Sequence, residues 1–354
     1  MNALSEPDLA SCGAPARADG ATQDATVRCT ASTPERTITF DCPPGATLLD
    51  AALAAGWELP YSCRRGSCET CRADIVSGQV APAASADGSA LLCCTRPLSD
   101  VTIAPLRIER KTARDEPRRV TGKLYRLRWA ASDVAVLDIR FPAGTRAAFK
   151  AGQYLNVLID GHEPRSFSMA NAPRASDGVQ LHVRVVPGGL FGQRLKDGMA
   201  AGEPIDLELP FGDFHLREAP GKPAILVAGG TGFAPMQSLL EDALAKNPDR
   251  EFTLYWGGRN LASLYAMDQI ARWQRRHKHF RFVGVLSEEP PPAGLRAGLV
   301  HQAVLADHPS LADCDVYVCG APGLVQAARA DFTARGLPPD RFFADSFVTP
   351  GEQL

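Results

Sequence analysis

The sequence predicts a multidomain protein that combines α+β and α/β modules. Three observations carry this prediction. A cysteine-rich unit with short strands and one helix occupies 26–106, six short strands follow over 120–218, and strands alternate with helices over 219–354. Short strands bounded by Gly, Pro or Asp are typical of antiparallel sheets, whereas strand–helix alternation is typical of a parallel sheet covered by helices.

Composition and charge exclude several classes of protein. Apolar residues make up 45% of the 354 residues and charged residues 22%, which is usual for a globular protein. The formal net charge of -2 gives no sign of nucleic-acid binding, and no run of about 18 apolar residues predicts a membrane span. The first residues lack the basic and apolar parts of a signal peptide, so we expect a cytoplasmic protein with reduced thiols.

The first module follows a tail, residues 1–25, that is rich in Ala, Ser, Asp and Gly and is expected to be disordered. Two strands should meet at a turn at Pro34-Glu35, and a helix of about ten residues should begin after Thr47. Two further strands close the unit. The charge-dense stretch 107–119 is interpreted as a linker.

The second module is predicted to be an antiparallel barrel. Its six strands lie in the stretches TGKLYRLRWA, VAVLDIRF, QYLNVLI, RSFSMAN, VQLHVRVV and PIDLELP, with a helix in GLFGQRLKDGM. The third module repeats strand and helix, beginning with AILVA and APMQSLLEDALAK and ending with RFFAD. Such alternation predicts a parallel sheet with helices on both faces.

The stretch YSCRRGSCETC holds three cysteines, Cys63, Cys68 and Cys71, and Cys93 follows after 21 residues. The spacing C-x4-C-x2-C with a later Cys is that of plant-type [2Fe-2S] proteins, in which four thiolates hold two irons. Gly66 would relieve the backbone where the loop wraps the cluster. The alternative is a structural zinc site, but the second C-x2-4-C pair that such sites use is absent.

The stretches LPYSCRRGSCETC and LLCCTRPLSD resemble the ferredoxin domain fused to bacterial NAD-dependent reductases. The resemblance implies a β-grasp fold and makes Cys93 the fourth ligand, with Cys94 as its neighbour. Glu69 stands where the family usually has Gly, and its charge is expected to lower the cluster potential. Cys29 and Cys42 fall in strands and are interpreted as buried structural residues.

The stretches AGQYLNV and EPRSFSMANAP resemble the flavin-binding segment of the ferredoxin-reductase family. The resemblance implies that Arg165 binds a flavin phosphate, that an aromatic ring stacks on the flavin and that Ser168 reaches its N5 atom. In HVRVVPGGLFG, the glycines would let the backbone approach the pyrophosphate while Gly192 replaces a usual Ser or Thr. The predicted FAD-binding residues are Arg165, Ser166, Phe167, Ser168, Arg184, Gly188 and Gly189.

The stretch AILVAGGTGFAPM places a glycine turn between a strand and a helix, as nucleotide-binding modules do. It departs from the pattern G-x-G-x-x-G because Pro235 replaces the third Gly, and it resembles the ferredoxin-reductase nucleotide module instead. The predicted NADH-binding residues are Gly229, Gly230, Thr231, Gly232, Pro235 and Arg259. A single arginine in WGGRN favours NADH over NADPH, whose extra phosphate usually meets several cations.

The same resemblance implies three residues on the nicotinamide side. Cys319, in the stretch VYVCGAPG, would lie near the nicotinamide C4 atom. Asp345 would lie near the reacting rings and Phe347 would cover the flavin until nicotinamide displaces it. The predicted catalytic residues are therefore Ser168, Cys319 and Asp345.

Taken together, the three modules resemble the reductase components of multicomponent aromatic-ring-hydroxylating dioxygenases, in particular the terephthalate dioxygenase type. That resemblance implies that NADH gives a hydride to FAD, and that the [2Fe-2S] cluster passes single electrons to a separate Rieske oxygenase. The alternatives are the reductase of a CDP-deoxyhexulose dehydrase or of a diiron monooxygenase, and, in another class, a non-catalytic iron-sulfur carrier. Arg64, Arg65, Arg72 and Arg96 are expected to dock on an acidic patch of the oxygenase.

Overall fold

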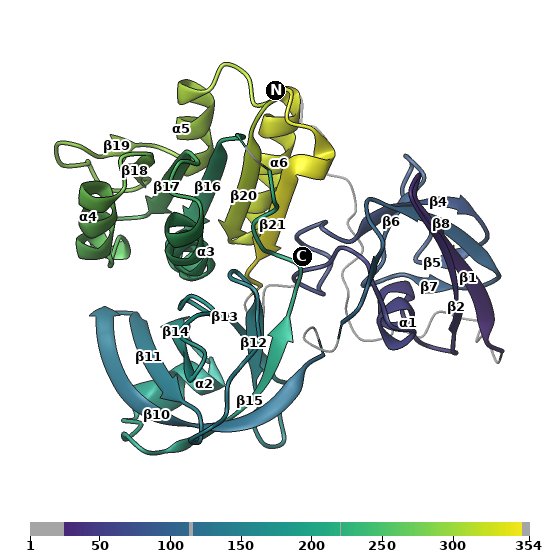
Figure 1. The fold of residues 1–354 in the computed structure, drawn as a ribbon, viewed down its shortest axis with the longest axis horizontal. Helices are drawn as coiled ribbons and strands as arrows, with labels where there is room; N and C mark the ends of the chain where they lie inside the picture. The colour runs from purple at the N-terminus through teal and green to yellow at the C-terminus, as the bar shows by residue number, and fades with distance from the viewer. Residues whose placement is uncertain (1–24, 113–115, 220, 349–354) are drawn as a thin grey trace. The chain divides into compact units, whose positions relative to one another are not determined.

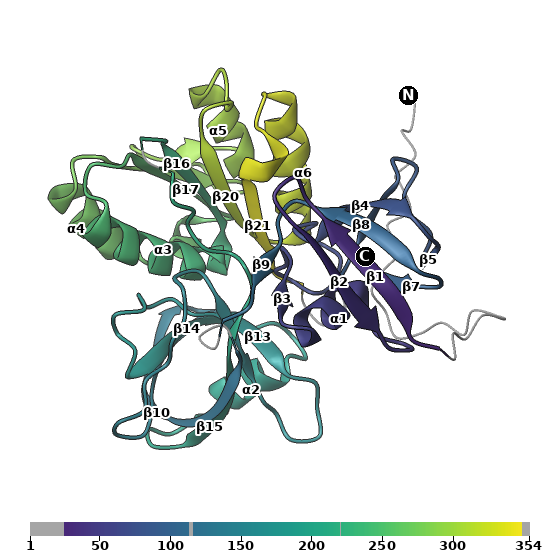
Figure 2. The ribbon, with the colours of Figure 1, turned by 45° about the vertical axis from the view of Figure 1, so that its right-hand side comes forward.

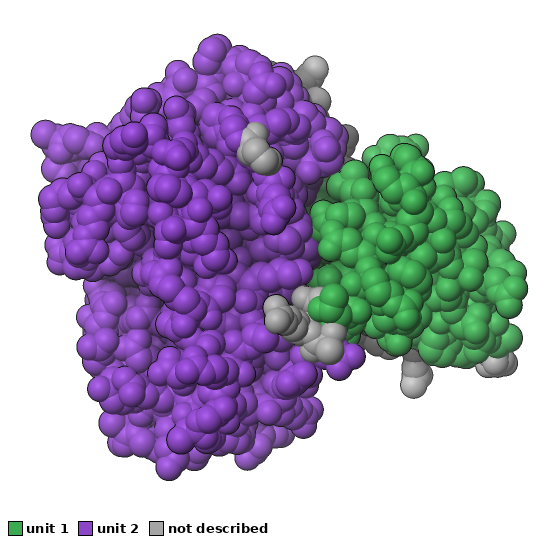
Figure 3. Space-filling view, in the orientation of Figure 1, with its two compact units in different colours: residues 1–112, 348–354 green, residues 113–347 purple. Residues whose placement is uncertain are grey.

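The structure is a computed structural model that describes residues 25–112, 116–219 and 221–348. The chain divides into two units, residues 1–112 with 348–354 and residues 113–347 (Figure 3). The expected disordered tail lies outside the described residues, apart from Ala25. No helix in the described part of the chain is long and apolar enough to cross a membrane.

The first unit is built on a five-stranded mixed sheet in the order β2-β1-β8-β4-β6 (Figure 1). A hairpin pairs β1 with β2, β1 runs parallel to β8, and β4 lies antiparallel to β8 and β6. Two small sheets, β3-β9 and β5-β7, complete it. The strands are β1 (Val27–Ser32), β2 (Thr37–Cys42), β3 (Trp57–Glu58), β4 (Arg72–Ser77), β5 (Val80–Ala81), β6 (Ser89–Leu91), β7 (Arg96–Pro97), β8 (Val101–Pro105) and β9 (Glu109–Arg110).

Helix α1 (Leu48–Ala54) begins where the sequence predicts, because the Thr47 hydroxyl accepts a hydrogen bond from the Asp50 N–H at 3.1 Å. The helix has seven residues rather than about ten, since the chain turns at Gly56, whose φ of 81° is left-handed. Its buried side chains pack against the sheet and cover Cys29 and Cys42, which are both buried as predicted.

The predicted linker, 107–119, contains regular structure at both of its ends. Strand β9 (Glu109–Arg110) pairs antiparallel with β3 (Trp57–Glu58), and the Arg110 guanidinium lies 4.7 Å from the centre of the Trp57 ring. At the other end β10 already begins at Arg118. The charge-rich pattern missed both strands, because backbone pairing and stacking on Trp57 do not depend on apolar alternation.

The second unit begins with a six-stranded antiparallel sheet in the order β13-β12-β15-β10-β11-β14. Its edge strands approach each other through the Met169–Leu181 bridge, so the sheet forms a nearly closed barrel around an apolar core (Figure 2). All six predicted strands and the predicted helix are present. They are β10 (Arg118–Ala131), β11 (Val134–Arg140), β12 (Tyr154–Val157), β13 (Arg165–Ser168), β14 (Gly178–Arg184), β15 (Pro204–Phe211) and α2 (Leu190–Lys196).

The rest of the second unit is a parallel six-stranded sheet in the order β19-β18-β17-β16-β20-β21. Helices α3 and α4 pack on the face that carries Trp256, while α5 lies on the opposite face, where the Tyr255 hydroxyl meets Asp307. The predicted strand–helix alternation is confirmed. Its elements are β16 (Ala224–Gly229), α3 (Phe233–Lys246), β17 (Phe252–Gly258), α4 (Met267–Arg276), β18 (Phe280–Leu286), β19 (Arg296–Ala297), α5 (Val300–Asp307), β20 (Asp315–Gly320), α6 (Pro322–Ala334) and β21 (Phe342–Ser346).

Candidate cofactor sites

The cysteine loop is wound in an unusual backbone conformation. Arg64, Gly66 and Glu69 all have left-handed φ values, of 55°, 78° and 57°. Non-glycine residues rarely adopt this region, and turns that contain such residues can aim neighbouring backbone N–H groups at one centre. The Arg65 N–H already points at the Cys63 sulfur, at 3.4 Å. The loop therefore has the geometry that surrounds thiolates with hydrogen-bond donors.

The sheet brings the fourth cysteine to this loop. Cys71 directly precedes β4 and Cys93 follows β6, and these two strands pair antiparallel with Arg72 opposite Leu91. The Leu92 N–H donates to the Cys71 carbonyl at 3.1 Å, which fixes the distant segment beside the loop. Cys93 and Cys94 have sulfurs 3.5 Å apart, so both lie at this end of the sheet.

The cysteine thiols interact in pairs. A hydrogen bond with Cys68 is the largest cause that lowers the pKa of Cys63, to about 5, and the Arg65 N–H adds to it. The pKa of Cys68 is raised by that same pair, and the pKa of Cys71 is raised by its contact with Cys93, both with burial as the next cause. No three His, Cys, Asp or Glu side chains in the described part of the chain converge as ligands of one metal ion. Four mostly buried sulfurs spread over two contacting pairs fit a two-iron cluster, which needs four thiolates around two centres.

Charges around the loop are more balanced than the sequence suggests. Arg64 forms an ion pair with Asp50, and Arg72 pairs with Glu69 at 3.0 Å and with Asp87 at 3.1 Å. Arg72 therefore partly neutralises Glu69, the residue expected to lower the cluster potential. Arg65 and Arg96 are exposed.

The predicted flavin strand, β13, pairs with β12, which places Ser168 opposite Tyr154. The Ser168 side chain is 4% exposed, and its Oγ has no hydrogen-bond partner among the described residues. A buried unpaired hydroxyl is costly unless a ligand satisfies it, so Ser168 fits the predicted contact with flavin. Phe167 and Phe191 lie with ring centres 5.5 Å apart.

Arg165 and Arg184, the two arginines predicted to bind flavin phosphates, lie in different surroundings. The Arg165 guanidinium donates to the carbonyls of Glu163 and Pro164 at 2.9 and 3.4 Å, so no carboxylate neutralises it in these contacts. Arg184 ends β14, lies 3.4 Å from Asp133 and reaches the turn at Gly230. A Cβ added to Gly230 would lie 3.1 Å from the Arg184 guanidinium.

The glycine pair of the second flavin segment leads into α2 as predicted. Gly188 has a φ of 73°, which favours glycine, and Gly189 immediately precedes the helix. Gly192 stands where the family usually has Ser or Thr, and the packing of α2 explains the difference. A Cβ there would lie 3.0 Å from the Val185 side chain, so the backbone of α2 packs directly on the end of β14.

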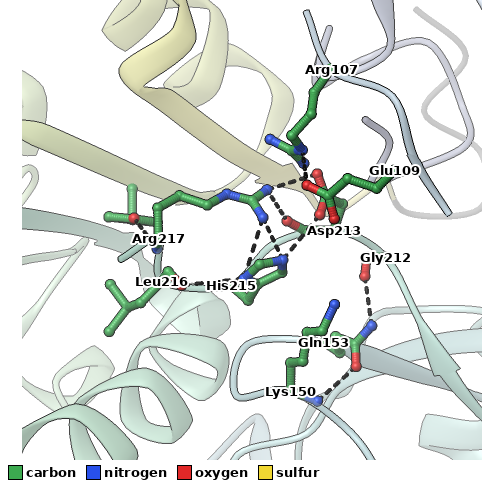
Figure 4. Close-up of polar contacts among 10 residues, drawn as sticks. Arg107, Glu109, Lys150, Gln153, Gly212, Asp213, His215, Leu216 and Arg217 are labelled. Carbon is green, nitrogen blue, oxygen red and sulfur yellow. Dashed lines mark hydrogen bonds and ion pairs between the residues drawn. The ribbon is translucent and has the colours of Figure 1, made fainter. Parts of the chain in front are cut away.

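The connection from the barrel to the parallel sheet is held by a polar cluster that sequence reasoning missed (Figure 4). Buried Asp213 accepts hydrogen bonds from Arg217 at 2.7 Å and lies 3.1 Å from His215. The Arg217 N–H also donates to the Tyr317 hydroxyl at 2.9 Å, and Gln153 donates to the Gly212 carbonyl at 2.8 Å. The short stretch GDFHLR shows no apolar period, so only the fold reveals that these side chains meet.

The predicted nucleotide turn lies at the carboxyl ends of β16 and β20. Strand β17 lies on one side of β16 and β20 lies on the other, so the order of the strands reverses at β16. Ligands of parallel sheets bind at such switch points. A Cβ on Gly232 would lie 2.1 Å from the Cys319 carbonyl oxygen, so only glycine permits this close approach.

Other predicted nucleotide residues surround the same edge. Gly230 has a φ of 53°, and its carbonyl accepts a hydrogen bond from the Trp256 indole at 2.9 Å. Thr231 is half-buried, and Pro235 is buried in the first turn of α3. Arg259 is exposed directly after β17, the neighbouring strand. The turn, the helix N-terminus and one exposed cation thus share one edge of the sheet.

The structure brings the three nicotinamide-side residues to the ends of β20 and β21. Cys319 and Asp345 are partners across these parallel strands, and both are buried. Burial raises the pKa of the Cys319 thiol well above its ordinary value, with Asp345 as the second cause. The Phe347 N–H donates to the Gly320 carbonyl at 2.8 Å. Cys319 is therefore a neutral thiol suited to contact rather than to nucleophilic attack.

Three parts of the chain match known domain families. Residues 32–98 match the 2Fe-2S iron-sulfur cluster binding domain, residues 123–216 the oxidoreductase FAD-binding domain, and residues 226–330 the oxidoreductase NAD-binding domain. These matches confirm the three predicted kinds of module and, with them, the predicted [2Fe-2S], FAD and NAD cofactors.

Relatives of known name align with almost the whole chain. The sequence is 41% identical over 321 residues to the Comamonas sp. protein terephthalate 1,2-dioxygenase, reductase component 2, covering 88% of this chain and 95% of that relative. It is 34% identical over 322 residues to the CDP-6-deoxy-L-threo-D-glycero-4-hexulose-3-dehydrase reductase of Yersinia pseudotuberculosis, covering 88% and 96%. Among solved structures, the Amycolatopsis cytochrome P450 reductase GcoB has a TM-score of 0.73 and 36% identity, covering 90% of this chain and 99% of that one.

Proposed function

The chain belongs to the family of reductase components that join [2Fe-2S], FAD-binding and NAD-binding modules, and we propose that its electron acceptor is a Rieske-type oxygenase of aromatic-ring catabolism. The activity common to the family is that of an oxidoreductase, which moves electrons from a nicotinamide nucleotide to a separate protein: a dioxygenase for the terephthalate relatives and a dehydrase for the Yersinia relative. The observation that carries the finer proposal is the 41% identity to a terephthalate dioxygenase reductase.

The cluster ligands in this proposal are Cys63, Cys68, Cys71 and Cys93. The left-handed loop and the β4-β6 pairing support them, because both gather these sulfurs at one end of the sheet. The loop's backbone donors would stabilise negative charge on the sulfurs. Cys94 is proposed as a neighbour and not a ligand.

The flavin and nicotinamide roles are proposals of the same kind. When bound, FAD supplies the chemistry that accepts a hydride from NADH and releases its electrons singly. Ser168 would donate a hydrogen bond to the flavin at N5, a role that its buried, unpaired hydroxyl supports. Arg165 and Arg184 would bind phosphates. The residues that would line the flavin are Ser166, Phe167, Gly188 and Gly189. Phe347 would cover the flavin. Cys319 and Asp345 would line the nicotinamide pocket, with Cys319 as a neutral thiol because burial raises its pKa.

We propose NADH rather than NADPH as the electron donor. The residues assigned to it are Gly229, Gly230, Thr231, Gly232, Pro235 and Arg259. Arg259 is the exposed cation at the carboxyl end of β17, where the adenosine ribose of a nucleotide would lie in this fold. A 2'-phosphate would favour several cations at this place, and the stretch WGGRN supplies one.

The domain boundaries and location belong to the same proposal. The domains would be 26–106 for the cluster, 107–119 as a connection that includes β9, 120–218 for the flavin and 219–354 for the nucleotide. A cytoplasmic location would keep the thiols reduced and NADH available.

Reconstitution tests the acceptor. Purified protein and NADH are mixed anaerobically with a Rieske oxygenase of an aromatic acid, a cytochrome P450 or a deoxyhexulose dehydrase, and reduction of each acceptor is followed by its own absorbance. We expect the Rieske centre to be reduced with the highest kcat/KM. Preference for either other acceptor would contradict the Rieske assignment and leave the family activity standing.

A simpler assay separates an enzyme from a non-catalytic carrier. An NADH-oxidising reductase should reduce cytochrome c continuously at the expense of NADH, because each catalytic cycle renews the reduced cluster. A carrier without turnover would leave the cytochrome oxidised.

A further inference from the structure

A chain of hydrogen bonds links the outer surface of the barrel to the nucleotide module. His182 lies on β14, where Leu181 and Val183 face the barrel core, so its side chain points outward. It is nevertheless only 6% exposed, because the nucleotide module covers it. Its Nδ1 lies 3.0 Å from the Tyr265 hydroxyl and its Nε2 lies 3.3 Å from the Gln180 Oε1.

The partners fix the direction of every bond in this chain. The Gln180 Oε1 can only accept, so His182 carries its proton on Nε2 and leaves Nδ1 as an acceptor. The Tyr265 hydroxyl must then donate to Nδ1. The Gln180 amide donates in turn to Asp138 at 2.7 Å, and Asp138 is paired with Arg126 at 2.8 Å. The neutral His182 imidazole is therefore held in one tautomer. It accepts from Tyr265 and donates to Gln180, whose amide is fixed by the Asp138–Arg126 ion pair.

Electrostatics keep the imidazole in this neutral form. Burial, followed by the charge of Arg128, lowers the pKa of His182 to about 3, and only Asp138 acts in the opposite direction. Burial likewise raises the pKa of the Tyr265 hydroxyl, which therefore stays a donor. The direction of each hydrogen bond in this series is therefore the same across the physiological range of pH.

The same chain reaches the residues that shape the nucleotide turn. The Gln237 amide of α3 donates to the Gln180 Oε1 at 2.9 Å, so α3 is tied to the barrel as well. Tyr265 packs edge-on to Trp256, with ring centres 5.2 Å apart, and the Trp256 indole bonds to the Gly230 carbonyl. Phe233, at the start of α3, stacks on Trp256 at 4.1 Å and on His182 at 6.2 Å.

We propose that His182 is a positioning residue that holds the nucleotide turn and α3 in register with the flavin barrel, and so sets the approach of nicotinamide to flavin. Hydride transfer is very sensitive to such registration, because a misplacement of about 1 Å can slow a reaction by about a hundredfold. The inference rests on the NAD-to-FAD half of the family activity and not on the proposed acceptor.

Two variants remove the bonds and keep the packing. Tyr265→Phe deletes only the hydroxyl, and His182→Phe keeps a ring against Phe233. The matched control is Tyr255→Phe, which deletes the hydroxyl that donates to Asp307 at 2.9 Å on the opposite face of the sheet. We expect the limiting rate of flavin reduction by NADH to fall about tenfold in the first two variants. FAD content and the NADH concentration at half-maximal rate should stay within about twofold, and the control should match the wild type.

Two further measurements separate positioning from loss of stability. The double variant should be no slower than the slower single variant, because both changes break one chain. In protein freed of cofactors, amide hydrogen exchange over 230–240 should quicken with Tyr265→Phe and not with Tyr255→Phe. Unchanged reduction rates in both interface variants, or equal loss in the control, would overturn the inference. A wild type that NADH does not reduce would instead refute the family activity.

Discussion

Ser168 carries the most specific chemical expectation of any single side chain, since its hydroxyl is buried and unpaired among the described residues. We expect Ser168→Ala to slow flavin reduction by NADH about tenfold to a hundredfold, which corresponds to the loss of one hydrogen bond in a buried site. Flavin content should not change, because the phosphates are bound elsewhere. Stopped-flow absorbance measures the rate.

The control for Ser168 is Ser176→Ala, which removes a barrel hydroxyl that accepts from Arg146 at 3.3 Å. It should leave the rate of flavin reduction at the wild-type value. An unchanged rate in Ser168→Ala would argue against contact with N5, and loss of the flavin would assign Ser168 to binding instead.

His182 makes a second residue-scale prediction, which concerns acid stability. Its pKa falls from an ordinary 6.5 to about 3 on folding, so between these values the unfolded chain binds the extra proton. Stability contributed by the neutral imidazole is complete above the unfolded pKa and is lost as the pH falls. The groups around it are Arg128 on β10, Asp138 on β11, and Tyr265 after β17.

We therefore expect His182→Phe to flatten the dependence of Tm on pH between about pH 4 and pH 6. The wild type should lose Tm more steeply over that range, and the two slopes should agree above about pH 7. Thermal unfolding followed by circular dichroism provides the measurement. Parallel curves across the whole range would show that His182 is not the group responsible.

At the scale of the element, the pairing of β4 with β6 decides which cysteine completes the cluster. Cys93→Ser should abolish the visible absorbance and the electron paramagnetic resonance signal of the cluster, because one thiolate of four is lost. Cys94→Ser, a change of the adjacent residue, should preserve both signals. Equal loss in the two variants would contradict the ligand assignment.

The glycine turn after β16 offers an element-scale test of close packing. A Cβ at position 232 would lie 2.1 Å from the Cys319 carbonyl oxygen, so the ends of β16 and β20 would have to separate. We expect Gly232→Ala to lower the free energy of unfolding by about 1–3 kcal/mol and to weaken NADH binding.

The matched control is Gly323→Ala in α6, where an added Cβ meets nothing within 4 Å. It should be neutral or stabilise the protein by up to about 1 kcal/mol, since alanine favours helix. Chemical denaturation and NADH titration compare the two variants. Equal behaviour would show that the close approach at Gly232 is not needed.

Most elements could be predicted because their sequence patterns have a single physical interpretation. The barrel strands alternate apolar and polar residues, and Thr47 caps α1 where a capping residue was expected. Strand β9 could not be predicted, because it pairs through its backbone and stacks an arginine on Trp57. The kind of cofactor could be predicted where a motif has fixed spacing, since the cysteine loop lies within the part of the chain that matches the 2Fe-2S domain.

Contacts between distant segments were not predictable. His182 looks in the sequence like an ordinary strand histidine, and its partner Tyr265 lies 83 positions further along the chain. Gln237, which donates to its other partner Gln180, lies 57 positions beyond Gln180. Likewise, the pairing of Arg72 with Glu69 and Asp87 depends on how β4 meets β6. The separation of two residues in the sequence does not predict such a contact until the strand order is known.

For the whole molecule, charge around the cluster bears on how the protein finds its acceptor. Arg64, Arg65, Arg72 and Arg96 lie in the same region as Asp50, Glu69 and Asp87, so these arginines exceed these carboxylates by one, before the charge of the cluster and its thiolates is counted. We expect a shallow decrease of acceptor reduction with ionic strength, about threefold or less up to about 0.2 M salt.

Arg65→Glu should slow acceptor reduction at low salt more than Arg275→Glu, a reversal on α4 of the other unit. Steady-state kcat/KM for the oxygenase measures both variants. Indifference to salt and to the Arg65 reversal would contradict electrostatic docking at the cluster.

In the proposed function, one polypeptide receives a hydride from NADH and delivers single electrons through its iron-sulfur module. The most direct measurement is anaerobic rapid mixing of purified protein with one equivalent of NADH, with flavin and cluster absorbance followed together. We predict that the flavin bleaches first and that the cluster is reduced afterwards, with a matching resonance signal in frozen samples. A flavin that stays oxidised, or a cluster that stays oxidised beside a bleached flavin, would contradict the claim.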